Sequence, residues 1–430
     1  PLPAKESRAG KFLGFDGLGN PAILAQPGAA LTPLAQITSY LKANLPAVGN
    51  AGTLAHVLDD ARGLWLDTGT AWVNVNGNVI NALDYLKGDG TDEHSAFQAM
   101  LDTGLSIYFP VPPVAYAFDG VLTLTSSHQV LFGAGSGSIL RSLSPSTNMF
   151  VTGANVEGCG FFDLAIEGAA TDNTTAQYFL FTSPTYYLRR SLFARVRIKN
   201  VNNAMLFDDG SDENWVDECR FELLRGATSG HGYGVQMGNA VGTIATRNRF
   251  FGSTGNGRHA FYVGTGTSYS YIAGNYIQDW QQDCIVVYAL TAQNACQHNI
   301  IVNNTIVGGL TDATEGAAIS LSGKVHHNLI AGNKITGFTD TGILVSDSGQ
   351  NGQCEDNTIQ GNMISGCGNF GILIIGTKRT NALGNVVLDN SQSSPGTYSG
   401  IDIRSQGSFG SEVDADTSVV NNIVRGADHR

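Results

Sequence analysis

The sequence has little charge and no long apolar run, and each shortage excludes a class of protein. Only 14% of the 430 residues are charged, and 24 Lys+Arg against 36 Asp+Glu give a net charge of −12. Disordered chains carry more charge and fewer apolar residues than the 42% present here. So acidic a chain is not expected to bind nucleic acid, and without a run of about 18 apolar residues it is not expected to insert into a membrane.

Cysteine is also scarce, and its spacing excludes two kinds of stabilisation. The six cysteines lie tens of residues apart and form no CxxC motif. In a chain long enough to form its own core, such scattered cysteines predict free buried thiols rather than a disulfide framework. No zinc-ligand spacing is present, so we expect neither a metal nor another cofactor. The cysteines are Cys159, Cys219, Cys284, Cys296, Cys354 and Cys367.

Glycine and asparagine are abundant, with 54 Gly and 33 Asn, and both belong to a repeat. Asn275, Asn304, Asn333 and Asn362 follow one another at intervals of 29 residues, and each begins a short apolar segment. Asn385 and Asn422 begin two further copies. A second kind of short apolar segment recurs between them, at residues 260–263, 284–287, 318–321, 342–345, 371–374 and 400–403.

This repeat predicts an all-β protein with the architecture of a right-handed parallel β-helix. The segments alternate apolar and polar residues, as half-buried strands do, and no helical stretch separates them. Each period then forms one coil of a single-stranded solenoid, and the repeated asparagines form a ladder of side-chain amides at one corner. At about 4.8 Å a coil, about ten coils give a rod about 50 Å long.

The composition predicts four successive parts. Residues 1–35 form an extended segment, and residues 36–84 form a small N-terminal module. Within that module we expect short helices at 37–43 and 53–61 and a hairpin of 64–67 with 71–74. Residues 85–120 contain a helix that caps the open end of the solenoid, with Asp92 at its N-terminus and Phe97 and Leu101 on its buried face. Residues 121–430 form the β-helix.

A turn, a helix and two strands at residues 85–141 carry a recognisable order of motifs. They are Gly88–Asp92, Phe97–Leu101, Ile107–Pro110 and Gly133–Leu140. This order resembles the entry of the pectate-lyase-like β-helix superfamily, although Glu93 or His94 stands near the family's second acid. The resemblance implies the fold and leaves the reaction open, because this fold carries lyases, hydrolases, epimerases and adhesins.

A second set of motifs lies at the N-terminus, in Leu2–Lys5, Arg8–Asp16 and Gly19–Pro21. These residues resemble the corresponding segment of bacteriophage tailspikes. The resemblance implies a virion protein of the phage tail that acts at the bacterial cell surface, where it binds a surface polysaccharide such as lipopolysaccharide O-antigen or capsule. It also implies a homotrimer attached to the tail or baseplate through its N-terminus. Because the last repeat ends close to Arg430, we expect such subunits to meet along the rods.

Aligning the strands by their apolar positions brings candidate catalytic residues onto neighbouring coils. The alignment superposes Phe261, Ile285 and Ile319, and the corner before these strands then reads Tyr233, His259, Asp283 and Ala317. Hydrolysis of a glycoside needs two carboxyl groups, about 5 Å apart for retention and farther apart for inversion. We predict Asp283 with Glu315 or Asp279 as this pair, and His259 as a further catalytic residue. The predicted sugar-binding residues are Arg258, Tyr233, Tyr262, Trp280 and Tyr288.

Two other functions remain open at this point. A polysaccharide lyase removes a proton from a uronate with a base and neutralises the carboxylate with a cation, which Tyr233, Arg258 and His259 can supply. A spike that only binds its receptor needs neither arrangement. A rival acidic cluster, with six acids between Asp208 and Glu218, fits a solvated loop, a cation site or an alternative pair of catalytic acids.

Overall fold

The structure, a computed structural model, divides the chain into two units, Pro1–Asn81 and Ala82–Arg430. Before residue 79 it describes only the backbone of short strands. From there it describes residues 79–169, 177–182, 184–224, 226, 231–252, 257–280, 282–290, 294–309, 316–347, 353–404 and 416–426. No helix among these residues is long and apolar enough to span a membrane.

The first unit contains short strands. The predicted hairpin is confirmed, because β5 (Leu64–Asp67) pairs antiparallel with β6 (Trp72–Asn74). The helices predicted at 37–43 and 53–61 are wrong, because β3 (Thr38–Tyr40) and β4 (Leu54–Val57) form strands there and pair with each other. Segments this short are too weak to nucleate a helix, and strand pairing prevails. The remaining strands are β1 (Phe12–Phe15), β2 (Pro21–Leu24) and β7 (Val79–Asn81).

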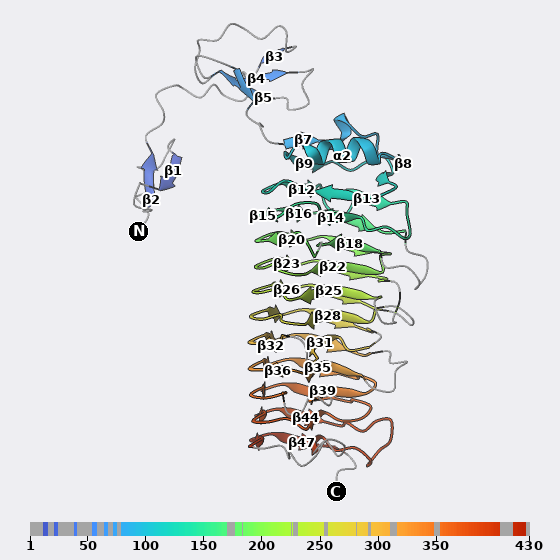
Figure 1. The fold of residues 1–430 in the computed structure, drawn as a ribbon, viewed down its shortest axis with the longest axis vertical. Helices are drawn as coiled ribbons and strands as arrows, with labels where there is room; N and C mark the ends of the chain where they lie inside the picture. The colour runs from blue at the N-terminus through green and yellow to red at the C-terminus, as the bar shows by residue number, and fades with distance from the viewer. Residues whose placement is uncertain are drawn as a thin grey trace. The chain divides into compact units, whose positions relative to one another are not determined.

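The second unit begins with the predicted cap. A 3₁₀ turn, η3 (Ala82–Asp84), precedes the α-helix α2 (His94–Asp102). Phe97 is fully buried and packs edge-on against Phe118, at 5.6 Å between ring centroids. The Asp92 carboxylate accepts hydrogen bonds from the backbone N–H groups of His94, at 3.0 Å, and Asp119, at 2.8 Å. The helix therefore closes the N-terminal end of the rod, as predicted (Figure 1).

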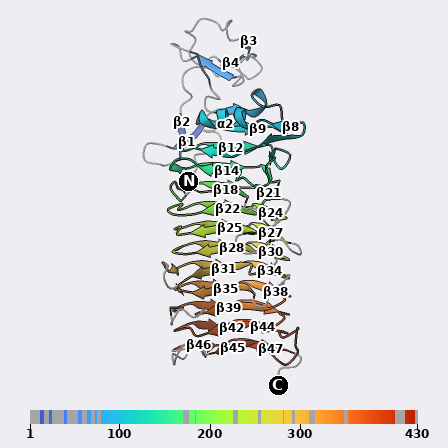
Figure 2. The ribbon, with the colours of Figure 1, turned by 45° about the vertical axis from the view of Figure 1, so that its right-hand side comes forward.

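The rod is a parallel β-helix with three long sheets, and Figures 1 and 2 show its coils stacked along one axis. Sheet 1 has 11 strands, one more than the number of coils expected, and carries the candidate site. Every strand in it pairs in parallel with the equivalent strand of the next coil. Its strands are β11 (Leu122–Leu124), β14 (Phe150–Thr152), β18 (Tyr178–Phe181), β22 (Asn203–Phe207), β25 (Tyr233–Gly238), β28 (His259–Gly264), β31 (Ile285–Ala289), β35 (Ala317–Gly323), β39 (Thr341–Ser346), β42 (Ile372–Ile375) and β45 (Ile401–Arg404).

Sheet 2 supplies the third strand of each coil, which the repeat left undecided. Its strands are short, and a tight turn joins most of them to the following strand of sheet 3. They are β9 (Ser106–Phe109), β12 (Val130–Gly133), β16 (Gly160–Phe162), β20 (Leu192–Ala194), β23 (Trp215–Asp217), β26 (Ile244–Thr246), β29 (Tyr271–Ala273), β33 (Ile300–Val302), β37 (Leu329–Ala331), β40 (Thr358–Gln360), β43 (Asn381–Leu383) and β46 (Ser418–Val420).

Sheet 3 contains the strands that follow the repeated asparagines, as the sequence predicts. Two small two-stranded sheets, β15 (Val156–Glu157) with β19 (Leu188–Arg189) and β32 (Cys296–Gln297) with β36 (Val325–His326), lie in the loops. The strands of sheet 3 are β8 (Asp89–Asp92), β10 (Ala115–Phe118), β13 (Ile139–Ser142), β17 (Ala165–Glu167), β21 (Arg197–Lys199), β24 (Arg220–Glu222), β27 (Arg249–Phe251), β30 (Tyr276–Gln278), β34 (Thr305–Val307), β38 (Lys334–Thr336), β41 (Met363–Ser365), β44 (Val386–Leu388) and β47 (Ile423–Arg425).

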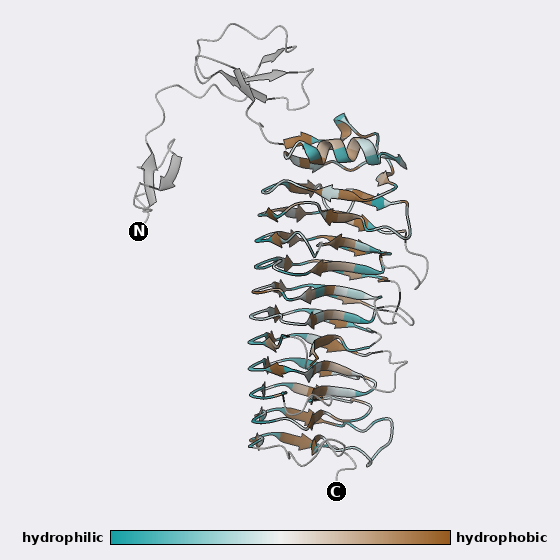
Figure 3. Ribbon diagram, viewed as in Figure 1, coloured by the Kyte–Doolittle hydropathy of each residue, from teal (hydrophilic) through white to brown (hydrophobic). Residues whose placement is uncertain are grey.

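The core lies inside the coils, where equivalent apolar side chains stack on one another. Ile277, Ile306 and Ile335 occupy one such column and are fully buried. Aromatic rings fill the columns nearer the N-terminus, where Phe221 stacks on Phe250 at 4.3 Å between ring centroids. Figure 3 shows hydrophobic colour along the strands and hydrophilic colour at many turns. All six cysteines are buried and free, which confirms the prediction for them.

The predicted asparagine ladder is present at the corner between sheets 2 and 3. The Asn304 Nδ2 group donates to the carbonyl oxygen of Ile272 and to Oδ1 of Asn333, both at 3.0 Å. The backbone N–H of Asn304 also donates to Asn333 Oδ1, at 2.9 Å. A second ladder, of Asn299, Asn328 and Asn357, was not predicted. Each rung satisfies polar groups that the corner would otherwise bury without a partner.

Candidate functional site

The predicted stacking of corner residues is present at the start of the sheet 1 strands. Tyr233 pairs with His259 on the next coil, and the pairing of Ile285 with Ile319 places Asp283 opposite Ala317. Gly232, with φ +85°, helps to fix this register, because a Cβ there would lie 2.6 Å from the backbone nitrogen of Arg258 on the next coil. Glycine therefore lets neighbouring coils approach closely enough for their corner side chains to meet.

An aromatic patch forms on sheet 1. It consists of Tyr178, Tyr262 and Tyr288, which are half-buried, and of Tyr233 and His259, which are only 7% and 4% exposed. The rings of Tyr233 and His259 are stacked, with centroids 5.4 Å apart and planes 7° from parallel. The Tyr262 ring lies 5.4 Å from that of Tyr233 and 5.7 Å from that of His259. Burial raises the pKa of Tyr178 and of Tyr262 to about 12, so both remain neutral phenols at ordinary pH. The patch combines apolar ring surface with hydroxyl groups, which suits a sugar.

Arg258 lies at the edge of the aromatic patch in a fixed orientation. Its Nε donates to Oε1 of Gln282 at 2.6 Å, and its Nη1 donates to the Tyr233 hydroxyl at 2.8 Å. The side chain is half-buried. These contacts hold a positive charge beside the rings, and a role for Arg258 in binding sugar stays a prediction.

Asp283 is the predicted acid with the most perturbed environment. Its Oδ1 accepts a hydrogen bond from the backbone N–H of Ala317 at 2.6 Å. Burial raises the pKa of Asp283 to about 6; the Ala317 N–H and the charge of Arg258 act against this rise, and the charge of Asp340 adds to it. A carboxyl group with a pKa near neutrality is suited to donate a proton in catalysis.

Asp340 is the carboxyl group that the sequence analysis missed. Its Oδ2 accepts from the backbone N–H of Gly316 at 2.9 Å, so the two aspartates bond to adjacent residues of the coil between them. Because those two N–H groups are successive, the bonded carboxylate oxygens cannot be more than about 9 Å apart. Extending the alignment by one coil would have found Asp340, since Thr341 pairs with Ala317.

His259 lies within the patch but has little capacity to carry a proton. The side chain is 4% exposed, and its Nδ1 lies 2.9 Å from the backbone carbonyl oxygen of Asp283. Burial lowers the pKa of His259 to about 3, so the ring is neutral. Since the carbonyl oxygen is an acceptor, Nδ1 is the protonated nitrogen. The geometry favours a role for His259 in positioning Tyr233 and the Asp283 backbone.

The other predicted residues lie in different surroundings. The Asp279 carboxylate accepts a hydrogen bond from Gln278 Nε2 at 3.1 Å and lies over Gly308. The Asp283 carboxylate instead accepts its hydrogen bond from the backbone N–H of Ala317. Trp280 is fully buried and packs edge-on against Phe250 at 5.7 Å, so its prediction as a sugar platform is corrected. The indole fills the interior because it follows the sheet 3 corner directly. Tyr262 and Tyr288 are half-buried on the outer surface, and Glu315 lies outside the described residues.

The rival acidic cluster, Asp208–Glu218, is divided between corners of the coil. Asp212 pairs with Arg189 at 3.3 Å, Glu213 with Arg190 at 3.7 Å, and Asp217 and Glu218 both pair with Arg247. No group of three metal-ligating side chains was found among the described residues. Asp208 differs from the others, because it lies on the sheet 1 side, where burial raises its pKa. The ion pairs favour a structural role for most of this cluster.

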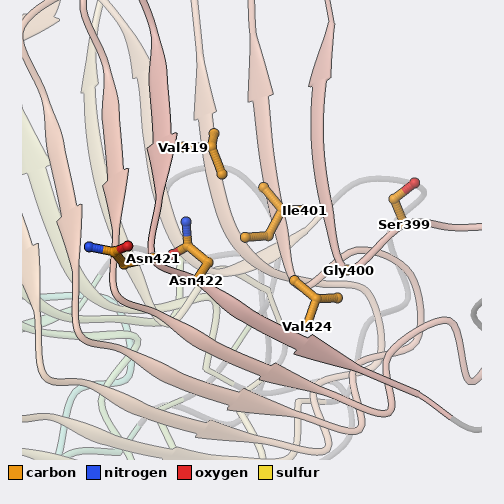
Figure 4. A pocket seen from close by; sticks show the side chains of 7 residues that line it. All are labelled: Ser399, Gly400, Ile401, Val419, Asn421, Asn422 and Val424. Carbon is orange, nitrogen blue, oxygen red and sulfur yellow. The ribbon is translucent and has the colours of Figure 1, made fainter.

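The hollow shown in Figure 4 lies at the C-terminal end of the rod, away from the aromatic patch. Val419 and Val424 continue two core columns there but are 41% and 43% exposed, because no described coil follows them. The lining contains no titratable side chain; it consists of Ser399, Gly400, Ile401, Val419, Asn421, Asn422 and Val424. The hollow is therefore the open end of the apolar core.

Comparison with known proteins supports the fold. No protein-family model matches the sequence, and no curated protein is similar enough to match it. Among solved structures, a tailspike protein of E. coli bacteriophage HK620 matches with a TM-score of 0.61 and 14% identity, over 83% of this chain and 69% of that one. An exopolygalacturonase from Thermotoga maritima matches with a TM-score of 0.58 and 11% identity, over 82% and 92% of the two chains.

A second tailspike has the same architecture. The Dettilon tailspike protein matches with a TM-score of 0.53 and 14% identity, over 82% of this chain and 70% of that one. At these identities the likeness establishes the parallel β-helix and leaves the chemistry to the residues of this chain. The predicted fold is therefore confirmed.

Proposed function

We propose that the protein is a phage tailspike that binds a bacterial surface polysaccharide and cleaves its internal glycosidic bonds by carboxylate-based hydrolysis. The observation that carries this proposal is the convergence of Asp283 and Asp340 on Gly316 and Ala317, beside the aromatic patch. The shared fold of two tailspikes and a polysaccharide-degrading enzyme supports it.

In the proposed reaction Asp283 is the general acid and Asp340 the base. Protonated Asp283 gives its proton to the glycosidic oxygen as the bond from that oxygen to the anomeric carbon breaks. A water molecule bonds to the anomeric carbon, and Asp340 takes the proton that the water loses. The upper limit of about 9 Å between the two bonded carboxylate oxygens admits the separation that this inverting reaction needs. Tyr262 and Tyr288 hold the sugar rings.

The lyase alternative has weaker support from the side chains present. A lyase needs a base able to remove a proton next to a carboxylate. Of the residues predicted for a lyase, His259, with its pKa lowered to about 3 by burial, is poorly matched to that step near neutral pH, and Tyr233 is only 7% exposed. Asp283, with a pKa of about 6, is well matched to acid catalysis.

The simplest test separates cleavage from binding alone. We expect the purified protein to shorten at least one polymer in a panel of O-antigen and capsular polysaccharides, as measured by size-exclusion chromatography. Binding to a polymer whose length stays constant would contradict the proposed enzyme and favour a spike that only adheres.

The outer surface of sheet 2 carries an apolar stripe that supports assembly into a homotrimer. The stripe continues through five successive coils, and three of its side chains, Trp215, Tyr271 and Ile300, are 37–42% exposed. Because the coils of two identical rods have the same spacing, a second, parallel copy can place each of its coils beside a coil of the first. We propose that the subunits meet along this stripe, which consists of Trp215, Ile244, Tyr271, Ile300 and Leu329, and that residues 1–35 attach the trimer to the phage tail or baseplate.

A charge placed in the stripe is expected to prevent assembly. Light scattering should give about three times the chain mass of 45.3 kDa for the unmodified protein and a much smaller mass for Ile300→Glu, because association would bury the new carboxylate. Met363→Glu, at an exposed apolar residue of sheet 3, is the control and should remain trimeric. A trimeric Ile300→Glu variant would place the interface elsewhere.

A further inference from the structure

Among the arginines that the structure describes, one half-buried side chain has no carboxylate partner, and it points to a ligand. Most arginines described by the structure have a carboxylate oxygen within 4.0 Å, and Arg247, for example, pairs with both Asp217 and Glu218. Within the same part of the chain, Arg249, Arg258 and Arg425 have none. Arg249 and Arg425 are exposed to water, whereas Arg258 is half-buried. Water therefore solvates Arg258 less completely than the other two, and an anion is the natural partner for it.

The orientation of Arg258 suits a carboxylate. Gln282 and Tyr233 engage Nε and Nη1, and the guanidinium group carries five N–H donors in a planar fork. The guanidinium carbon lies 5.8 Å from the centroid of the Tyr233 ring, so the remaining donors lie beside the aromatic patch. An anionic group bound here would be part of a molecule that also contacts the half-buried Tyr262.

We propose that Arg258 binds the carboxylate of an acidic sugar unit, so that the substrate is an acidic polysaccharide. This inference rests on the proposed function and specifies its substrate class. Each side of the patch then has a distinct role. Arg258 selects the charged unit, the rings hold the neighbouring sugar, and Asp283 lies one coil farther on, opposite His259.

Binding of a carboxylate would also assist the proposed acid. The positive charge of Arg258 acts against the rise in the pKa of Asp283. A bound carboxylate would offset that charge and so favour the protonated form of Asp283 when substrate is present. Substrate recognition and proton donation would then be coupled through one side chain.

The test compares Arg258→Gln with the full chain on acidic and neutral polymers. The panel contains uronate-bearing capsular polysaccharides, neutral O-antigens, and a carboxyl-reduced form of each acidic polymer that binds. We expect Arg258→Gln to weaken binding of the acidic polymer by about 10- to 100-fold, the range for hydrogen bonds to a charged group. Carboxyl reduction should weaken binding by the unmodified protein similarly, and should have little further effect on Arg258→Gln.

Two further variants keep the result interpretable. Arg249→Gln removes an unpaired arginine from sheet 3 and should bind as the unmodified protein does. Arg258→Lys keeps the charge without the planar fork and should show an intermediate loss. Each variant is compared in thermal unfolding, so that a loss of binding without a loss of stability supports the assignment.

The outcomes separate this inference from the proposed function. Arg258-dependent binding of acidic polymers without shortening would support the inference and contradict cleavage. Shortening of neutral polymers alone, or an equal effect of carboxyl reduction on the unmodified protein and on Arg258→Gln, would overturn the inference and leave cleavage standing. Failure to bind any acidic polymer would also overturn it.

Discussion

Replacing Asp283 with asparagine is expected to lower the rate of polysaccharide cleavage by at least about 1,000-fold while the rod stays folded. Asparagine keeps an oxygen that can accept the hydrogen bond from the Ala317 N–H, but it has no proton to give to the glycosidic oxygen. Asp340→Asn should have a comparable effect, because it removes the proposed base. The measurement is the initial rate of reducing-end formation for the two variants and the unmodified protein.

The pH dependence provides an independent check on the same residue. Because the pKa of Asp283 is raised to about 6 by burial, kcat/KM should fall as the pH rises through about 6 and the acid ionises. The fold favours neutral Asp283, so its contribution to stability is present below the ordinary pKa of an aspartate and is lost as the pH rises through about 6. Asp283→Asn should therefore be at least as stable as the unmodified protein at pH 8.

A matched control is Asp389→Asn, the same change at an exposed corner near the end of sheet 3. It should keep normal activity and stability. An active Asp283→Asn variant, or one that loses activity only because it unfolds, would assign Asp283 a structural role at the corner.

Replacing Asn304 with alanine is expected to lower the free energy of unfolding by about 4 kcal/mol. The Asn304 side chain is fully buried, and Asn275 donates to its Oδ1 through both its backbone N–H, at 3.0 Å, and its Nδ2, at 2.9 Å. Alanine would leave the backbone N–H of Asn275 and the carbonyl oxygen of Ile272 buried without these partners. Denaturant unfolding followed by circular dichroism measures the loss.

The control for Asn304 is Asn294→Ala, at an exposed side chain, which should change stability by less than about 0.5 kcal/mol. Equal stability of the two variants would show that the ladder fills space at the corner without stabilising it. A loss confined to Asn304→Ala would confirm that each rung joins two neighbouring coils.

The repeat made most of the rod predictable, because stacking turns a sequence period into spatial neighbours. Asn275 and Asn304 are one period apart in the sequence and adjacent in the structure. The same logic correctly placed Tyr233, His259 and Asp283 at one corner. The N-terminal helices at 37–43 and 53–61 were wrong because no repeat constrains that region, and weak local preferences alone decided the prediction.

The site was less predictable than the fold, because side-chain direction at a corner does not follow from the repeat. Trp280 and Asp283 are three residues apart, yet the indole is buried and the carboxyl group reaches the next coil. Asp340 was missed because the alignment ended at Ala317, one coil too early; its link to Asp283 passes through the backbone of that coil, at Gly316 and Ala317. Sequence alignment of neighbouring strands does not show such a contact.

The most direct test of the proposed chemistry is analysis of the new chain ends formed from a polysaccharide that the protein shortens. Hydrolysis by Asp283 and Asp340 predicts new reducing ends without the ultraviolet absorbance of an unsaturated uronate, and predicts that Asp283→Asn forms none. Reducing ends that appear together with that absorbance would contradict hydrolysis and assign the reaction to β-elimination.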